Sequence, residues 1–224
     1  YSNLASSDKR LTKGIIGEAA FTTGMSGYQE TATDPSFLGQ HIIFTSAHIG
    51  NYQNDERVNQ NFSNSKSVAT SLIARNFSYN DFFKNCDIPL ISDIDTRALT
   101  KYLSGKAKDH RCIITTNQAP PKFDDYQLHC NELSRVSITQ KQIIKVGENP
   151  VVVIDYGIKK SIINYLSELE VPLVVVPHNT PAQEVLKFRP RMVFLSNGPG
   201  DPKNYTREIL QVRELLVNNI AIRG

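Results

Sequence analysis

The sequence predicts an α/β protein whose second part is a doubly wound parallel sheet, and three observations support this fold class. Short β-branched runs alternate with helical patterns over residues 150–224. Each run ends in a turn that leads into the next helical pattern, as right-handed crossovers require. The hydrophobic fraction of 40% and the charged fraction of 21% are typical of a globular chain that can bury a core.

The strands and helices of the second part follow one another in order. We expect strands at 151–155, 172–177 and 192–195, and a fourth that begins at Asn219. A first helix carries an apolar stripe of Ile158, Ile162, Ile163, Leu166 and Leu169, a second starts at Pro181, and a third carries Ile209, Leu210, Leu215 and Leu216. The sheet has just resumed where the sequence stops at Gly224, so we expect the domain to be incomplete there.

The first 149 residues are less regular. We expect strands at 40–45, 67–74 and 112–115 and a short helix at 80–85. A longer helix follows 91–95, capped by Asp95 or Thr96, with Leu99, Tyr102 and Leu103 on its apolar face. Residues 1–13 are expected to be an irregular lead-in and 117–149 a connector. The predicted domains are therefore 1–149 and 150–224.

Composition excludes several classes of function. The formal net charge of +3 is weak and no basic run interleaves with aromatics, so we expect no nucleic-acid partner. No apolar run approaches the roughly 20 residues of a membrane span, and the polar first residues lack the apolar core of a signal peptide. Cys86, Cys112 and Cys130 are odd in number and widely spaced, which favours a reducing compartment, the cytoplasm, and no structural zinc site.

A glycine-rich turn, SNGPGDP at 196–202, follows the third strand of the second part. Gly198 and Gly200 can adopt positive φ and present bare main-chain amides, while Pro199 stiffens the turn between them. Open α/β sheets bind ligands at the carboxyl ends of their strands, so the turn could supply an oxyanion hole. By composition alone, a plain Gly/Pro turn is the favoured interpretation.

Five further motifs lead to a family. The sequence contains GMSGYQE at 24–30, TDPSF at 33–37, HIGN at 48–51, IDTR at 94–97 and DYGIK at 155–159. The DYGIK motif, together with FLSNGPGDP at 194–202, resembles the class I (triad) glutamine amidotransferases. The four upstream motifs resemble the small-subunit N-terminal domain of carbamoyl-phosphate synthetase. The resemblance spans about residues 14–224 and implies that domain over 1–149, followed by the first part of an amidotransferase domain over 150–224.

The resemblance implies glutamine hydrolysis through a cysteine thiolate, a histidine and a glutamate. The ammonia would pass to a large synthetase subunit, which makes carbamoyl phosphate from bicarbonate and ATP for arginine and pyrimidine synthesis. We therefore expect L-glutamine as substrate and the large subunit as partner. ATP and Mg²⁺ would belong to that subunit, with no cofactor or metal in this chain.

Three site residues are carried over from the family. Gly198 would donate its N–H to the developing oxyanion, Gly200 would help to hold glutamine, and Ser36 would contact glutamine from the other domain. From the residues alone, Ser36 fits a serine that bonds its own turn after Asp34-Pro35. Capping alone explains Asp95 and Thr96 of the 94–97 motif.

The family's nucleophile lies in a Gly-x-Cys-x-Gly-His-Gln turn, in which Gly224 fits the first glycine. The cysteine would then lie about two residues beyond the end, and the opening hairpin of the family is also missing before Tyr1. We expect the segment to be inactive alone and read its three cysteines as core or surface thiols. A non-catalytic docking subunit of a synthetase is the alternative, and a generic nucleotide-binding module is a weaker one.

The remaining polar residues favour ordinary roles. His41 and His48 have no acidic or thiol partner at ligand spacing, so strand packing, or for His48 a loop near the subunit interface, is preferred to a metal site. Lys159 and Lys160 follow a turn into a helix but lack the full phosphate-loop pattern, and we expect them to be solvated.

Overall fold

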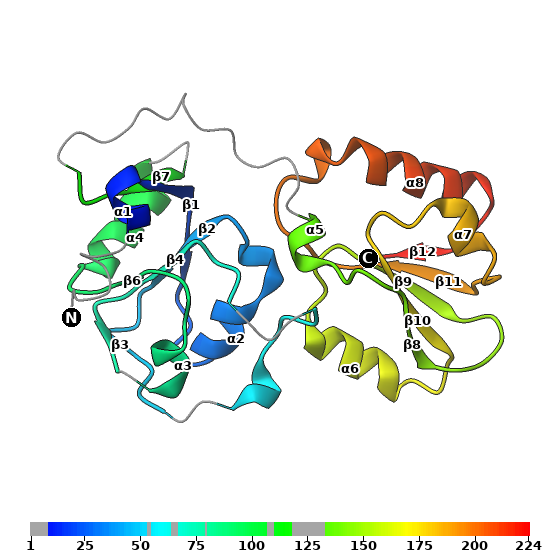
Figure 1. The fold of residues 1–224 in the computed structure, drawn as a ribbon, viewed down its shortest axis with the longest axis horizontal. Helices are drawn as coiled ribbons and strands as arrows, with labels where there is room; N and C mark the ends of the chain where they lie inside the picture. The colour runs from blue at the N-terminus through cyan, green and yellow to red at the C-terminus, as the bar shows by residue number, and fades with distance from the viewer. Residues whose placement is uncertain (1–8, 53–54, 64–66, 79, 107–109, 118–132) are drawn as a thin grey trace. The chain divides into compact units, whose positions relative to one another are not determined.

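The computed structural model describes residues 9–52, 55–63, 67–78, 80–106, 110–117 and 133–224. The chain forms two compact units, 1–59 with 66–130, and 60–65 with 131–224. Both have mixed α/β architecture around a largely parallel sheet (Figure 1). The predicted α/β class is confirmed. In the described residues no helix is long and apolar enough to cross a membrane.

A five-stranded sheet of order β6-β4-β2-β1-β7 forms the centre of the first unit. Its strands are β1 (Ile15–Thr22), β2 (Gln40–Phe44), β4 (Ser71–Ile73), β6 (Leu90–Ile91) and β7 (Arg111–Ile114). Neighbours pair in parallel except β7, which runs antiparallel to β1. Ile42 and Leu72, on adjacent strands, are completely buried in a cluster with Phe44 and Phe83. The strands expected near 40–45, 67–74 and 112–115 are thus present.

Short helices and a small second sheet complete the first unit. The helices are α1 (Lys9–Lys13), α2 (Tyr28–Thr33), η1 (Pro35–Phe37), η2 (Glu56–Val58), α3 (Asp81–Lys84) and α4 (Thr96–Lys106), and β3 (His48–Ile49) pairs with β5 (Asn76–Phe77). The cap of α4 is confirmed, since Asp95 Oδ1 accepts the N–H of Ala98 at 3.0 Å. Two expectations were wrong: residues 9–13 form a helix, and Tyr102 is 59% exposed.

The second unit has a sheet of order β12-β11-β9-β10-β8, with β8 alone antiparallel. The strands are β8 (Gln142–Lys145), β9 (Val151–Asp155), β10 (Leu173–Pro177), β11 (Met192–Leu195) and β12 (Ile222–Arg223), and the helices are α5 (Leu133–Val136), α6 (Lys160–Glu168), α7 (Ala182–Leu186), η4 (Pro202–Asn204) and α8 (Thr206–Val217). The alternation of strand and helix predicted from the sequence is confirmed in this unit.

Helices cover both faces of the second sheet, as a doubly wound fold requires (Figure 1). On β9, Val151 and Val153 pack in one cluster with Ile163 of α6. Val152 and Ile154 point to the opposite face and pack with Val185 of α7 and Leu215 of α8. Every residue of β9 is buried, which explains why this strand is an unbroken apolar run ending in one acid.

Several expectations for the second part need correction. Residues 117–149 are more than a connector, because α5 and β8 lie within them, and 131–149 pack with the second unit. Leu169 lies outside α6 and is 43% exposed, while Leu210 and Leu216 are exposed on α8. The last strand begins at Ile222 rather than Asn219. The domain boundary near Asn149 itself stays a prediction.

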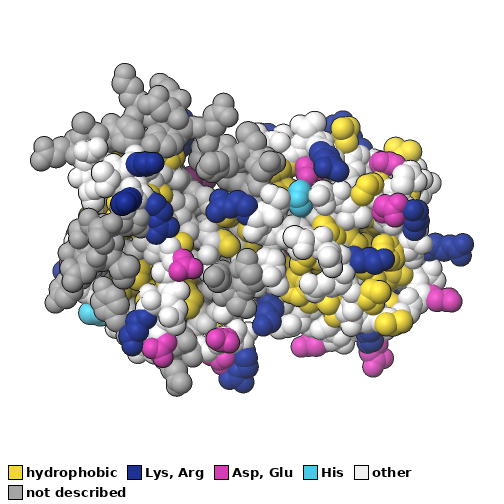
Figure 2. Space-filling view, viewed as in Figure 1, with side chains coloured by type: hydrophobic (Ala, Val, Ile, Leu, Met, Phe, Trp, Pro, Cys, Tyr) yellow, Lys and Arg dark blue, Asp and Glu magenta, His cyan; other side chains and the backbone are white. Residues whose placement is uncertain are grey.

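The surface carries charges of both signs. Figure 2 shows Lys and Arg side chains interspersed with Asp and Glu on both units, and hydrophobic side chains gathered over the sheet of the second unit. All four residues of β8 are exposed, with Ile143 at 56%. Because β8 is an edge strand whose four residues are all exposed, no alternation of apolar and polar residues marks it in the sequence.

Candidate functional site

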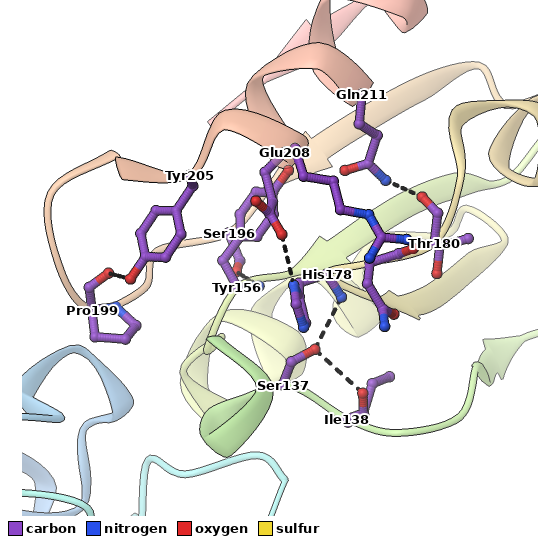
Figure 3. Close-up of polar contacts among 12 residues, drawn as sticks. Ser137, Ile138, Tyr156, His178, Thr180, Ser196, Pro199, Tyr205, Glu208 and Gln211 are labelled. Carbon is purple, nitrogen blue, oxygen red and sulfur yellow. Dashed lines mark hydrogen bonds and ion pairs between the residues drawn. The ribbon is translucent and has the colours of Figure 1, made fainter. Parts of the chain in front are cut away.

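The loop 196–202 leaves the carboxyl end of β11 and leads into η4 and α8. Its first residue is bonded to the end of the neighbouring strand, because Ser196 Oγ accepts the N–H of Tyr156 at 2.8 Å and donates to the carbonyl of Asn197 at 2.7 Å. The Tyr205 hydroxyl donates to the carbonyl of Pro199 at 3.1 Å (Figure 3). The start and the middle of the loop are therefore fixed by hydrogen bonds from outside it.

Two glycines in this loop are required for different reasons. Gly200 uses the conformational freedom expected of it, with φ of 76° in the left-handed region that other residues resist. Gly198 has φ outside that region, so a different constraint selects glycine there. A Cβ at Gly198 would lie 2.3 Å from the carbonyl oxygen of Tyr156, so close approach of two main chains requires this glycine.

A cavity of about 300 Å³ lies beside the loop and includes both glycines in its wall. It is lined by Leu133, Tyr156, Leu195, Ser196, Gly198, Pro199, Gly200, Pro202, Tyr205, Glu208, Ile209, Val212 and Arg213. Its surface is mostly apolar, with a few polar groups at the strand ends and on α8. This composition and position are those of a small-molecule site at the carboxyl end of a parallel sheet.

The turn between β9 and α6 is hydrogen-bonded to the loop. Asp155 Oδ1 accepts the N–H groups of Gly157 at 2.9 Å and Ile158 at 2.7 Å. Asn197, next to Gly198, accepts the N–H of Lys159 through Oδ1 at 3.3 Å and donates from Nδ2 to the carbonyl of Gly157 at 3.0 Å. The DYGIK and SNGPGDP motifs are therefore two halves of one hydrogen-bonded structure.

The acidic end of β9 is completely buried. Burial raises the pKa of Asp155, and the main-chain N–H groups of Ile158, Ile138 and Gly157 oppose that effect, as does nearby His178. Its second oxygen, Oδ2, accepts the N–H of Ile138 at 2.7 Å. A carboxylate that receives three amide hydrogen bonds has a structural role here, because no solvent reaches it.

A hydrogen-bonded pair, His178 and Glu208, lies at the head of α8, and Glu208 lines the cavity beside the loop. His178 Nδ1 is 3.0 Å from Glu208 Oε1, and both side chains are more than four-fifths buried (Figure 3). Burial, with a smaller effect from the charge of Glu208, raises the pKa of Tyr156 far above its usual range. The Tyr156 hydroxyl has no hydrogen-bond partner among the described residues, so this side chain is held neutral in the cavity wall.

The structure places Ser36 in the first unit, on η1. Asp34 Oδ1 accepts the N–H of Ser36 at 2.9 Å, so it is the Asp34 side chain that closes this turn. Ser36 is half-buried. The upstream motif at 24–30 serves the core of the same unit, since Gln29 is 2% exposed and its Nε2 donates to Asn59 Oδ1 at 2.7 Å. The role of Ser36 toward glutamine stays a prediction.

Neither described cysteine is suited to be a nucleophile. Burial raises the pKa of Cys86 and of Cys112, and both pack against apolar clusters of the first unit. This confirms them as core thiols, while Cys130 lies outside the described residues. His41 is completely buried on β2, as packing predicts, and His48 is exposed on β3. Over the described ranges no group of three potential ligands could hold a metal ion.

Several residues that shape the site carry no recognisable signal in the sequence. Asn197 and Tyr156 lie within the SNGPGDP and DYGIK motifs, but the motifs alone assign no function to either side chain. Gln60, His178 and Glu208 had no local pattern at all. Lys159 and Lys160 are half-buried rather than fully solvated, and the main-chain amides at this helix start are already bonded. Only the topology of the sheet brings these residues together.

Comparison with known proteins agrees with this geometry. Residues 152–224 match the family described as glutamine amidotransferase class-I, and residues 5–113 match carbamoyl-phosphate synthase small chain, CPSase domain. The second part is thus a class I glutamine amidotransferase domain, placed after a domain of a different family. Together the two matches cover most of the chain, which belongs to the carbamoyl-phosphate synthase small-chain family.

Curated relatives carry the same names. A carbamoyl phosphate synthase pyrimidine-specific small chain of Lactiplantibacillus plantarum is 37% identical over 217 residues, 91% of this chain and 59% of that protein. Carbamoyl phosphate synthase small chains of Listeria monocytogenes and Lactococcus lactis are 36% and 35% identical over 90% of this chain. The chain spans about three fifths of the length of these relatives.

Proposed function

We propose that this chain is part of the glutamine-hydrolysing small subunit of carbamoyl-phosphate synthase. The observation that carries the proposal is the loop at the end of β11, where the main chains of Gly198 and Gly200 line a cavity of about 300 Å³. A fixed N–H donor is what a tetrahedral intermediate of acyl transfer needs, and it is most effective where the surroundings are apolar. The family relationship supports glutamine as the acyl donor.

In this proposal a cysteine thiolate attacks the side-chain amide of glutamine and forms a glutamyl thioester with release of ammonia; water then hydrolyses the thioester to glutamate. Gly198 donates its N–H to the oxyanion, and Gly200 and Ser36 hold the glutamine. Residues 131–224 contain no cysteine, and burial raises the pKa of Cys86 and Cys112. We therefore expect residues 1–224 alone to release no ammonia from glutamine.

The ammonia would be delivered to a large synthetase subunit that uses bicarbonate, ATP and Mg²⁺. The name of the Lactiplantibacillus plantarum relative supports pyrimidine synthesis, and arginine synthesis is the second proposed use of the product. The proposed assembly is a heterodimer of small and large subunits. The odd number of widely spaced cysteines supports a place in the cytoplasm.

A glycine substitution in the complete protein tests this function. In Gly198→Ala the new Cβ would lie 2.3 Å from the Tyr156 carbonyl oxygen, so the loop must move and its amide leaves the oxyanion position. We expect glutamine-dependent carbamoyl phosphate synthesis with the large subunit to fall about 10²–10³-fold, while synthesis from free ammonia is retained.

The matched control is Gly105→Ala on α4, where a Cβ meets nothing within 4 Å. Wild-type glutamine turnover in a folded Gly198→Ala protein would contradict the oxyanion role. A wild-type protein that stabilises the large subunit but releases no ammonia from glutamine would instead favour a non-catalytic docking subunit.

A further inference from the structure

A short segment of the first half of the sequence belongs to the second unit. Residues 60–65 are separated from the rest of that unit by 66–130. Asn61, which is 1% exposed, forms an antiparallel bridge with Lys159. Phe62 packs against the cluster that contains Ile163 and Val153. We call the described part of this segment, residues 60–63, the strap; Figure 1 shows it reaching the start of α6.

The strap caps a helix that has no cap of its own. The N-cap residue of α6, Lys159, makes no side-chain capping bond. Gln60 supplies both missing acceptors: its main-chain carbonyl accepts the N–H of Lys160 at 2.8 Å, and its Oε1 accepts the N–H of Ser161 at 3.3 Å. The first N–H groups of a helix have no partner inside it, so acceptors from elsewhere in the chain stabilise its start.

The two main-chain amides that Gln60 accepts follow directly on the amides that are bonded to Asp155 and Asn197. From 157 to 161, five successive N–H groups are accepted in turn by Asp155, Asn197 and Gln60. Asn197 bonds the amide just before the two that Gln60 accepts, and it adjoins Gly198 in sequence. A displacement at the head of α6 therefore moves the anchor of the loop.

We propose that Gln60 is a positioning residue for glutamine hydrolysis, which sets the Gly198 amide by capping α6 beside Asn197. The expected effect of Gln60 on the rate of glutamine hydrolysis rests on the proposed function. Gln60 is not among the residues that line the cavity, so it acts through Lys159 and Asn197 rather than on the substrate. A cap that served stability alone would hold α6 but leave the loop unchanged when removed.

The kinetic test uses the complete protein with Gln60→Ala and Gln60→Glu. Alanine removes the acceptor of the Ser161 N–H, and we expect kcat for glutamine hydrolysis to fall about fivefold with KM nearly unchanged, as for an interaction made in the transition state. Glutamate keeps an acceptor oxygen and adds a charge favoured at a helix N-terminus, so it should restore the rate. Both variants are assayed well below their melting temperatures.

Two further comparisons make the test specific. Gln183→Ala removes another glutamine hydrogen bond, the exposed contact from Nε2 to Glu214 Oε1, and should leave kcat at its wild-type value. Combining Gln60→Ala with Asn197→Ala should reduce kcat by less than the product of the two separate effects, because both act on one turn. Multiplicative effects, or an unchanged kcat in Gln60→Ala, would overturn the proposal.

Amide hydrogen exchange tests the positioning independently of catalysis. In Gln60→Ala we expect faster exchange at Ser161 and also at residues 197–200, excluding Pro199. Faster exchange at Ser161 alone would reduce Gln60 to a local cap and refute its effect on the loop. If the wild-type protein released no ammonia from glutamine, the proposed function would fail, while the exchange result would still decide whether the strap positions the loop.

Discussion

The centre of the first sheet contains a histidine whose titration should control stability. The ring of His41 is completely buried, with Nδ1 2.8 Å from Ser71 Oγ, and Nε2 has no well-formed hydrogen bond among the described residues. Burial lowers the pKa of His41 to about 4, and the main chain at Cys112 and Ile15 opposes that effect only in part. The folded protein therefore favours the neutral ring.

The size and sign of the effect follow from linkage. An unfolded histidine has a pKa of about 6.5, so the unfolded chain binds a proton below that pH while the folded chain does not. The stability due to the neutral ring is complete above about pH 6.5 and is lost as the pH falls toward 4. Between pH 7 and pH 5 these two pKa values give a loss of about 2 kcal/mol in the free energy of unfolding.

Substitution of this residue makes the prediction measurable. In His41→Gln the side chain cannot titrate, so we expect the difference in unfolding free energy between pH 7 and pH 5 to shrink by about 2 kcal/mol. Urea unfolding followed by circular dichroism suits this chain, which has no tryptophan. His48→Gln, at an exposed position of β3, is the control and should keep the wild-type pH dependence. Wild-type dependence in His41→Gln, or a His41 ring that titrates near pH 6.5 by NMR in the folded protein, would refute the reasoning.

Two further substitutions test the site. Asp155→Asn replaces the oxygen that accepts the N–H of Ile138 by an amide N–H donor. Two buried donors would then face each other, which should lower the free energy of unfolding by about 1–3 kcal/mol. An unchanged urea midpoint would contradict the structural role of Asp155. Gly200→Ala must keep φ near 76°, which should cost about 1 kcal/mol in thermal unfolding, whereas Gly105→Ala in α4 should cost nothing; equal effects would show that the loop relaxes.

The buried strands of the second unit were predictable because their sequence and environment agree. The run 151–155 consists of β-branched residues closed by an acid, and every side chain in it is buried. β1 was missed although it is a central strand, because Gly17, Glu18 and two alanines have weak preference for strands. Its pairing with β2 and β7 decides its conformation, and a Cβ at Gly17 would lie 2.6 Å from the Gly39 carbonyl oxygen.

The candidate site was predictable only in part, for a similar reason. Gly198 and Gly200 were predictable from the sequence because they are separated only by Pro199, so the three residues form a recognisable local motif. The bond from Ser161 N–H to Gln60 Oε1 joins residues 101 positions apart, and no periodicity or local motif can indicate such a partner. His178 and Glu208, at the ends of different elements, meet only after β10 and α8 are in place.

The strap also determines how this amidotransferase domain could be transplanted. A gene fragment that encodes only residues 131–224 would contain all five strands of the second sheet but neither Gln60 nor Phe62. Two amides at the start of α6 would lose their acceptors, and the face that Phe62 covers would be open to water. Two separate segments of the chain therefore form this unit. A chimera that exchanges the unit between synthetases must include residues 60–65 as well as 131–224.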